Sequence, residues 1–248
     1  MKPISVVIIA KNESANIKRC IESCQNVSDD IIVMDTGSSD ETIKISTDLG
    51  AIVHKSDWLG YGQTKNKANQ VAKHNWILSL DADECLSKTL TNSILNTDFQ
   101  SNTVYCLNRI TCIGTQWIKH SGWHPQYFPR IFEKDKILWN SDSVHERLII
   151  PDNFDQIKMN GLLLHYSFKN VADLRQRLAH YSKLKAEQWI KTGTRLPLYK
   201  IYFGPVARFI AAYFLKLGIL DGKAGFIIGR EEAKMIKSAL KHYKRRNE

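Results

Sequence analysis

The sequence predicts a doubly wound α/β sheet that binds its ligand at the carboxyl ends of its strands. Strand-like and helix-like segments alternate four times in about the first 80 residues, as expected when helices cover both faces of a parallel sheet. The strand-like runs are continuously apolar and rich in β-branched residues, which is typical of strands buried on both faces. Polar side chains follow most of these runs, and ligands of such folds bind at that edge.

Each expected element follows from a local pattern. Apolar runs predict strands over 4–10, 31–34, 51–54, 76–84 and 103–110. Apolar residues at i, i+3, i+4 and i+7 after Ser14 predict a first helix, Ser38 and Glu41 have capping-box spacing before a second, and 63–73 predicts a third.

The totals indicate a folded chain in a reducing compartment. The 248 residues and 43% hydrophobic content suffice for one large domain with an appendage. The five cysteines are an odd number, and the apolar run 4–10 is too short for a secretory signal. We therefore expect a cytoplasmic location.

Positive charge is concentrated in the last third of the chain. Residues 169–248 contain 18 Lys/Arg and 6 Asp/Glu, a balance of +12, which leaves −2 for residues 1–168. A basic surface implies an anionic partner, with nucleic acid and anionic lipid as the two candidates.

The stretch WILSLDADE (76–84) carries the strongest chemical signal. Strand alternation would send Asp81 and Asp83 to one side, and paired carboxylates suit Mg²⁺ or Mn²⁺ with positions left for substrate phosphates. The alternative is a strand end followed by a helix start, the role expected for Glu84. No G-x-G-x-x-G follows the first strand and no P-loop motif occurs, so phosphates would be held by a metal and by side chains such as Lys65.

An ordered series of motifs resembles inverting family 2 glycosyltransferases of the GT-A fold. The series comprises SVVIIAKNE, IIVMDTGSSDET, GYGQTKN, WILSLDADE, GWHPQYFPRIF, SVHERL and LLLHYSF. The set is similar to bacterial lipopolysaccharide-core β-1,4-glucosyltransferases of the WaaE/LgtF type. The resemblance implies a mixed GT-A sheet flanked by helices and extends over most of the chain.

The resemblance also implies a nucleotide-sugar site at the strand ends. Asp35 would contact uracil or ribose, Asp81 would bind the nucleotide, and Asp83 would hold a Mn²⁺ or Mg²⁺ ion on the diphosphate. Many relatives have a second acid where this chain has Thr36. Four further residues are assigned to nucleotide-sugar binding: Asn12, Glu13, Lys65 and Asn66. For Lys65, the alternative is a solvated helix face.

Transfer with inversion needs one general base to deprotonate the acceptor hydroxyl. Glu146 in SVHERL is the first candidate and Asp142 the second, while an ion pair with Arg147 or Arg130 is the structural alternative for Glu146. By resemblance, His165 would supply a further metal ligand; otherwise it is a core histidine.

Two residues of the aromatic segment 117–132 are assigned to the acceptor. Trp123 would offer an aromatic face to a sugar, or else belong to the core. Arg130 would pair with an acceptor phosphate, or else brace a carboxylate.

The C-terminal region is expected to be helical and to reach a membrane surface. A helix is predicted over Val171–Lys191, another over Pro205–Leu220, and a last one from about Gly225. In the second helix, apolar positions form one stripe and Lys200, Arg208 and Lys216 project onto the opposite side, which favours an interfacial helix over a spanning one. The alternative is a helix packed on the body.

These observations converge on one interpretation with two alternatives. Residues 1–168 form the catalytic domain, divided into a nucleotide-sugar half (1–100) and an acceptor half (101–168), and 169–248 form a basic helical region. The chain is expected to move a hexose, glucose from UDP-glucose, to a lipid-linked acceptor, a heptose of the lipopolysaccharide inner core, as a peripheral protein on the cytoplasmic face of the inner membrane. The alternatives are a peptide glycosyltransferase and a basic nucleic-acid-binding protein without catalysis; under the favoured interpretation no nucleic acid is bound.

Overall fold

The chain folds into two compact units. The computed structural model describes residues 2–141, 146–194 and 196–247. The first unit comprises Met1–Arg109 and Gln126–His165, and the second comprises Ile110–Pro125 and Tyr166–Glu248. Residues 110–125, placed in the acceptor half by sequence, thus belong to the same unit as the C-terminal helices.

Four parallel strands form the start of the sheet in the first unit, as predicted. They are β1 (Ile4–Ala10), β2 (Asp30–Asp35), β3 (Ile52–Lys55) and β4 (Trp76–Asp81). Strand β1 pairs in parallel with β2 on one side and β4 on the other, and β2 pairs with β3. Every residue of β1 and β2 is buried, which explains why their sequences are apolar without alternation.

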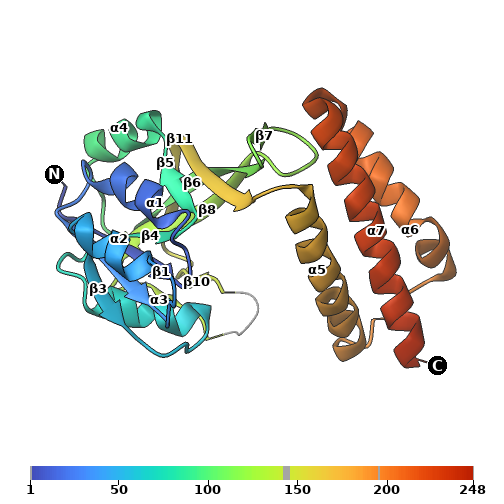
Figure 1. Ribbon diagram of the computed structural model, residues 1–248, viewed down its shortest axis with the longest axis horizontal. Helices are drawn as coiled ribbons and strands as arrows, with labels where there is room; N and C mark the ends of the chain where they lie inside the picture. Colours follow the sequence, from blue (N-terminus) through green and yellow to red (C-terminus); the bar gives the residue numbers. More distant parts are fainter. Residues whose placement is uncertain (1, 142–145, 195, 248) are drawn as a thin grey trace. The chain divides into compact units, whose positions relative to one another are not determined.

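Helices cover both faces of this sheet. They are α1 (Ile17–Cys24), α2 (Thr42–Asp48), α3 (Tyr61–Gln70) and α4 (Lys88–Asn96). The even-numbered residues of β1 share a core with α1 and α4, whereas Val7 and Ile9 share another with Ala68 of α3 (Figure 1). The predicted capping box is wrong, because α2 begins after Glu41 without a side-chain cap. The Ser38 hydroxyl instead accepts a hydrogen bond from the backbone amide of Asn12.

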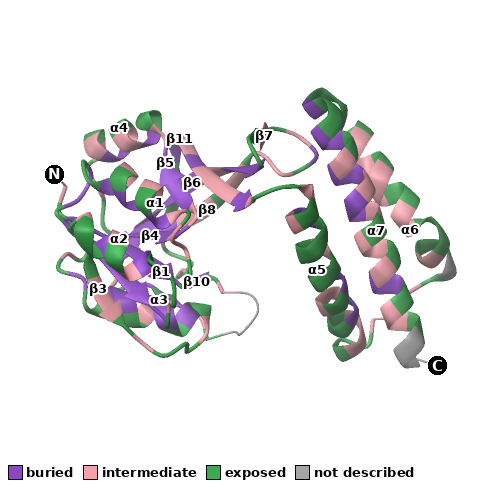
Figure 2. Cartoon of the chain, viewed as in Figure 1, coloured by how far each residue is buried: buried purple, intermediate pink, exposed green. Residues whose placement is uncertain are grey.

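Antiparallel strands complete the sheet. They are β5 (Glu84–Leu86), β6 (Thr103–Ile113), β7 (Gln116–Ile118), β8 (Gln126–Glu133) and β11 (Asp155–Phe168). The strand order is β3-β2-β1-β4-β8-β6-β11-β5, with β7 paired to β6. A separate two-stranded sheet joins β9 (Leu138–Trp139) and β10 (Leu148–Ile149). Buried residues are concentrated in the sheet (Figure 2), and the predicted mixed α/β fold is confirmed.

The second unit contains the C-terminal helices. They are α5 (Val171–Lys191), α6 (Leu198–Ile210), the π-helical η1 (Ala211–Leu215), the 3₁₀ turn η2 (Gly218–Asp221) and α7 (Gly222–Asn247). Helix α7 packs against both α5 and α6 (Figure 1). The predicted bounds of α5 are confirmed.

The predicted continuous helix over Pro205–Leu220 is wrong. The α-helix starts earlier, at Leu198, and ends at Ile210, because the chain then widens into η1 and turns at Leu217, which has a positive φ of 55°. The turn packs closely on α7: a Cβ at Gly225 would overlap the carbonyl oxygen of Gly218. Across the described residues, no single helix has both the length and the apolar character needed to cross a bilayer; Tyr199–Leu215 and Gly218–Lys244 meet that test only together, as a pair bent by 72°.

Candidate active site

The polar residues that follow the parallel strands lie at one edge of the sheet. In the register, Ala10 is opposite Asp35, and Ile9 is opposite Asp81. The ends of β1, β2 and β4 are therefore level, as the sequence predicts for a ligand site of this fold.

Asp35 presents an unsatisfied carboxylate oxygen beside a pocket. Its Oδ1 accepts hydrogen bonds of 3.0 Å from the backbone amides of both Gly37 and Ser38. Its Oδ2 is buried and has no hydrogen-bond partner among the described residues. The adjoining pocket has a volume of about 440 Å³ and is lined by Asp35, Gly37, Ser38, Ile43, Lys55, Ser56, Asp57 and Lys67. Because burying a polar atom without a partner is costly, a ligand donor in this pocket would complete the carboxylate.

Asn12 and Glu13 connect the loop after β1 to the loop after β2. The Asn12 side-chain oxygen accepts a 2.8 Å hydrogen bond from the Ser39 amide. The Glu13 amide donates to the Thr42 hydroxyl at 2.8 Å, and its carboxylate accepts from Asn16 at 2.9 Å. Their contacts hold the two loops together, and their binding to a nucleotide sugar stays a prediction.

Lys65 brings two predicted site residues together. Its Nζ lies 3.0 Å from Asp81 Oδ1, 3.8 Å from Glu146 Oε1 and 4.4 Å from the ring centre of Trp139. The lysine is only 1% exposed, so the solvated-face alternative is wrong. Through this lysine the base candidate lies beside the strand-end carboxylate.

Arg130 holds Asp81 from the other side. Its Nη2 is 3.0 Å from Asp81 Oδ2 and 2.7 Å from Glu84 Oε1. The carboxylate-bracing alternative for Arg130 thus describes its contacts in this structure, and contact with an acceptor phosphate stays a prediction.

Burial and charge act in opposite directions on Asp81. Burial raises the pKa of its carboxyl group, but Coulomb attraction and hydrogen bonds from Lys65 and Arg130 outweigh burial and hold that pKa well below its usual range. For Arg130, burial lowers the pKa of the guanidinium group, but the charges of Glu84 and Asp81 outweigh burial and hold that pKa above its ordinary value. Asp81 and Arg130 therefore both remain ionised in the folded protein at neutral pH.

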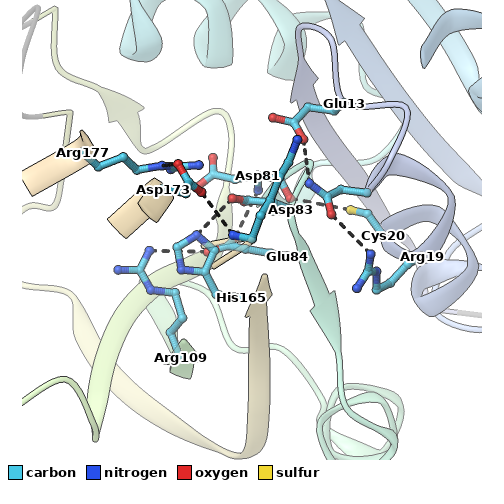
Figure 3. A network of polar contacts seen from close by, with 12 residues as sticks. Glu13, Arg19, Cys20, Asp81, Asp83, Glu84, Arg109, His165, Asp173 and Arg177 are labelled. Carbon is cyan, nitrogen blue, oxygen red and sulfur yellow. Dashed lines mark hydrogen bonds and ion pairs between the residues drawn. The ribbon is translucent and has the colours of Figure 1, made fainter. Parts of the chain in front are cut away.

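Glu84 belongs to the site, and its predicted role as a helix start is wrong. It lies in β5 with 0% exposure, four residues before α4 begins. Its Oε2 accepts a 3.0 Å hydrogen bond from the Asp81 backbone amide, and Arg109 Nη1 is 3.6 Å from its Oε1 (Figure 3). Arg109 was also missed, although an arginine within the apolar strand run VYCLNRITCI is a signal of buried charge pairing.

Asp83 faces His165. Strand β4 ends at Asp81, so the expected single strand 76–84 is wrong and strand alternation does not relate Asp81 to Asp83. Asp83 Oδ2 instead lies 3.3 Å from His165 Nε2, with both side chains mostly buried (Figure 3). In the β11–β5 register His165 is opposite Glu84, the residue that follows Asp83, so the pairing of the two strands brings His165 to the Asp83 turn.

The Asp83–His165 pair fits a divalent cation that is shared with substrate. A carboxylate oxygen and an imidazole nitrogen are both ligands of Mn²⁺, and Mg²⁺ accepts the oxygen. No group of three or more His, Cys, Asp or Glu side chains suited to a metal ion occurs in the described ranges. Among the described residues, Asp83 and His165 would hold such an ion together with oxygen donors from the substrate.

The remaining predicted residues either contact other parts of the chain or lie outside the described residues. The Asn66 amide group is occupied by the Trp139 backbone, donating to its oxygen and accepting from its nitrogen, both at 2.9 Å. In the second unit, Trp123 Nε1 donates to Glu232 at 2.9 Å, and its ring packs on Phe168. The second base candidate, Asp142, lies outside the described residues.

The fold and this strand-end site define the class of GT-A glycosyltransferases, which act on nucleotide sugars. Residues 5–156 match the model of glycosyl transferase family 2, and the chain belongs to this family. The predicted family and enzyme class are confirmed.

Three relatives indicate the range of similarity. An uncharacterised glycosyltransferase of Rickettsia bellii is 32% identical, with 91% of this chain and 81% of that protein covered. The lipopolysaccharide core biosynthesis glycosyltransferase LpsC of Rhizobium meliloti is 28% identical, with 91% and 86% covered. The mannosyltransferase PcManGT of Pyrobaculum calidifontis, solved with GDP-Man and Mn²⁺, shares the fold with a TM-score of 0.54, 13% identity, and 99% and 88% of the chains covered.

Proposed function

We propose that this chain transfers a hexose from a UDP-sugar, UDP-glucose in the first instance, to a saccharide hydroxyl with inversion at the anomeric carbon. The observation that supports this most directly is Lys65, which joins the base candidate Glu146 to the strand-end Asp81. A single-displacement transfer requires a general base close to the bound donor, and Lys65 contacts both the base candidate and the strand-end carboxylate.

The donor would lie along the edge formed by β1, β2 and β4. The free Oδ2 of Asp35 is suited to accept a hydrogen bond from the uracil N–H or a ribose hydroxyl in the adjoining pocket. Lys55 and Lys67 line the same pocket and supply positive charge for phosphates. This arrangement uses side chains where other nucleotide-binding folds use a glycine-rich loop.

Asp83 and His165 would hold the divalent cation, which when bound neutralises the charge of the diphosphate leaving group. The GDP-Man and Mn²⁺ in the PcManGT structure support this assignment by analogy of fold. Arg130 and Glu84 hold Asp81 at the end of β4, two residues before Asp83.

Glu146 would act as the general base. Its carboxylate takes the proton of the acceptor hydroxyl while that oxygen bonds to the anomeric carbon, and the bond from that carbon to the diphosphate oxygen breaks with its electron pair on the leaving UDP. Lys65 Nζ lies 3.8 Å from the Glu146 carboxylate and would orient it.

The acceptor we propose is a heptose of the lipopolysaccharide inner core, reached at the cytoplasmic face of the membrane. The support is the similarity to LpsC, a protein of lipopolysaccharide core biosynthesis, over most of both chains. The assignment of Trp123 to the acceptor, made from the sequence, stays a prediction.

A UDP-release screen across UDP-sugars, with Mn²⁺, Mg²⁺ or EDTA, tests the donor and the cation. We expect release with UDP-glucose and a metal, and a loss of about 100-fold or more in Asp83→Ala, since metal ligation stabilises the leaving group. The exposed Asp152→Ala is the matched control and should behave as wild type. Turnover with no UDP-sugar, or turnover indifferent to Asp83, would overturn the proposal.

Glu146→Gln tests the base separately from donor binding. The variant should bind UDP-glucose in calorimetry as wild type does, while transfer falls by roughly 10²–10⁴-fold. Glu22→Gln, on the exposed face of α1, provides the control. Full transfer by Glu146→Gln would assign the base to another residue.

A further inference from the structure

Helix α6 and the turns after it expose an unusual amount of apolar surface. The exposed large apolar side chains of α6 and η1 include Tyr199, Tyr202, Phe203, Val206, Ile210 and Phe214. The surface continues through Leu215, which is 77% exposed, and Leu217 to Ile219 and Leu220 in η2. We call this surface, spanning residues 199–220, the apolar ridge. Exposed apolar patches of this extent mark interaction sites.

Two basic side chains of this segment contact other parts of their own unit. Arg208 Nε lies 3.0 Å from Glu232 Oε2 on α7, and the side chain of Lys216 lies against Gly122. Phe209 and Tyr213 pack on Phe226 of α7. A helix that merely covers a protein core directs its charged side chains outward and its apolar ones inward. In α6, Arg208 is instead paired with α7, and large apolar side chains such as Phe203 and Val206 are exposed. The packed-helix alternative thus accounts for only part of α6.

Basic side chains lie beside the apolar ridge. A pocket of about 280 Å³ between α6 and α7 has apolar walls from Pro205, Val206 and Phe209 and an edge formed by Arg230, Lys234 and Lys237. The three cations are spaced at i, i+4 and i+7 on α7 and so share one face. We call Arg230, Lys234 and Lys237 the basic edge.

The positive charge of the basic edge is only partly neutralised within the unit. Glu231 Oε1 accepts from Arg230 at 2.8 Å, from Lys234 at 3.3 Å and from Arg175 at 3.1 Å. Burial raises the pKa of Glu231 and these three cations outweigh it, so the carboxyl group carries one negative charge against three positive ones. A net positive edge remains beside an apolar surface.

From this combination we propose that the apolar ridge and the basic edge dock the chain on an anionic phospholipid bilayer. The ridge side chains would enter the boundary between headgroups and acyl chains, and the basic edge would meet lipid phosphates. Tyr199 and Tyr202 suit this depth, because each has an apolar ring and a polar hydroxyl. The proposal does not depend on the sugar donor or acceptor.

The charge of the surface favours a bilayer over a second copy of the chain. In a symmetric pairing through this surface the same patch would meet itself, placing two sets of like-charged Arg230, Lys234 and Lys237 close together. An anionic bilayer satisfies the apolar and the basic parts at once.

Co-sedimentation with vesicles tests the proposal on the full chain. We expect wild type to bind phosphatidylcholine vesicles that contain phosphatidylglycerol, and to bind pure phosphatidylcholine at least several-fold more weakly, with binding that falls as salt screens the charges. The double variant Phe203→Ser/Leu215→Ser should bind the anionic vesicles at least about tenfold more weakly, because two large apolar side chains no longer enter the bilayer. Leu138→Ser/Ile149→Ser, two exposed apolar residues of β9 and β10, is the matched control and should bind as wild type.

The basic edge is tested by Lys234→Gln/Lys237→Gln, which should weaken binding to anionic vesicles about tenfold and leave the weak binding to phosphatidylcholine unchanged. Lys44→Gln/Lys88→Gln, on exposed positions of the first unit, is the control. Absence of vesicle binding by wild type, undiminished binding by the ridge variant, or a wild-type dimer that the ridge variant dissociates would each overturn the proposal. UDP release from UDP-sugars in detergent-free buffer, measured on the same variants, keeps this outcome separate from the proposed catalysis.

Discussion

The two units of the chain depart from the usual distribution of polar and apolar residues in opposite directions. The first unit buries charge: Lys65, Asp81, Glu84 and Arg130 form one network at the end of the sheet. The second unit exposes apolar surface along residues 199–220. Buried charges carry a desolvation cost and exposed apolar side chains forgo burial, so both features lower stability unless something outside the chain meets them.

The two units differ in whether the chain itself supplies partners for these unusual side chains. In the first unit the four charges of the network pair with one another, and the Asp35 Oδ2 is one of the few side-chain atoms of the site without a partner in the described residues. In the second unit Arg208 of α6 is paired with α7, whereas large apolar side chains of residues 199–220 are exposed. The first unit is therefore arranged for a small polar ligand, and the second for an extended surface.

The largest effect should come from breaking the charge network. Arg130→Met should lower the free energy of unfolding by about 3–5 kcal/mol, because it leaves the buried Glu84 without its nearest cation and removes one of the two cations beside Asp81. Urea unfolding followed by circular dichroism measures this, with the exposed Lys88→Met as the control expected within about 0.5 kcal/mol of wild type. Equal stability of the two variants would mean that the network is solvated rather than buried.

A smaller effect is expected at Asp35, which lines the pocket and whose Oδ2 has no partner among the described residues. Asp35→Asn should raise the Kd for UDP by roughly 10–100-fold, since a hydrogen bond to a charged group contributes about 1.5–3 kcal/mol. Isothermal calorimetry checks this, and Asp48→Asn, exposed at the end of α2, should leave Kd unchanged. An unaltered affinity for Asp35→Asn would separate the pocket beside Asp35 from the nucleotide site.

Acid should lower the free energy of unfolding, and Asp81 should account for part of that loss. The pKa of its carboxyl group is lower in the folded chain than in the unfolded chain, so its stabilising effect is complete above the unfolded value, near 3.9, and is lost as the pH falls from there toward the folded value. One proton accounts for at most about 1.4 kcal/mol per pH unit. Urea unfolding from roughly pH 5 to pH 3 should show a steeper loss for wild type than for Asp81→Asn; parallel curves would contradict the lowered pKa.

The smallest effect should come from the second unit. Phe203→Ser should change the free energy of unfolding by no more than about 0.5 kcal/mol in the absence of lipid, because the side chain is 67% exposed. Thermal unfolding of the two proteins without vesicles measures it. A large loss of stability would show that Phe203 is covered by the chain itself, and would remove the contrast between the two units.

Sequence patterns predicted the parts of this molecule that depend on local periodicity. The apolar run Ile4–Ala10 and the helix Val171–Lys191 have the bounds expected of them. The level strand ends follow from parallel pairing, which the alternation of elements implies. The family resemblance points to both Asp83 and His165, which the structure places 3.3 Å apart.

Features that depend on contacts distant in sequence could not be predicted in the same way. The role of Glu84 requires Arg130, which is 46 residues away and arrives on β8. Lys65 has the same polar neighbours in sequence whether it is solvated or buried, and only the packing of Trp139 and Asp81 decides. In α6, periodicity separates the two stripes, but the pairing of Arg208 depends on Glu232 of α7.

The hydrogen bond from the Asp81 backbone to Glu84 also bears on how the donor is bound. It ties the end of the parallel strand β4 to the antiparallel strand β5, with Ala82 and Asp83 held between two fixed points. A turn fixed at both ends has little conformational entropy left to lose when a ligand arrives. Amide hydrogen exchange around Asp83 should therefore be slow before any nucleotide is added, and the ordering that accompanies binding should be confined to other loops.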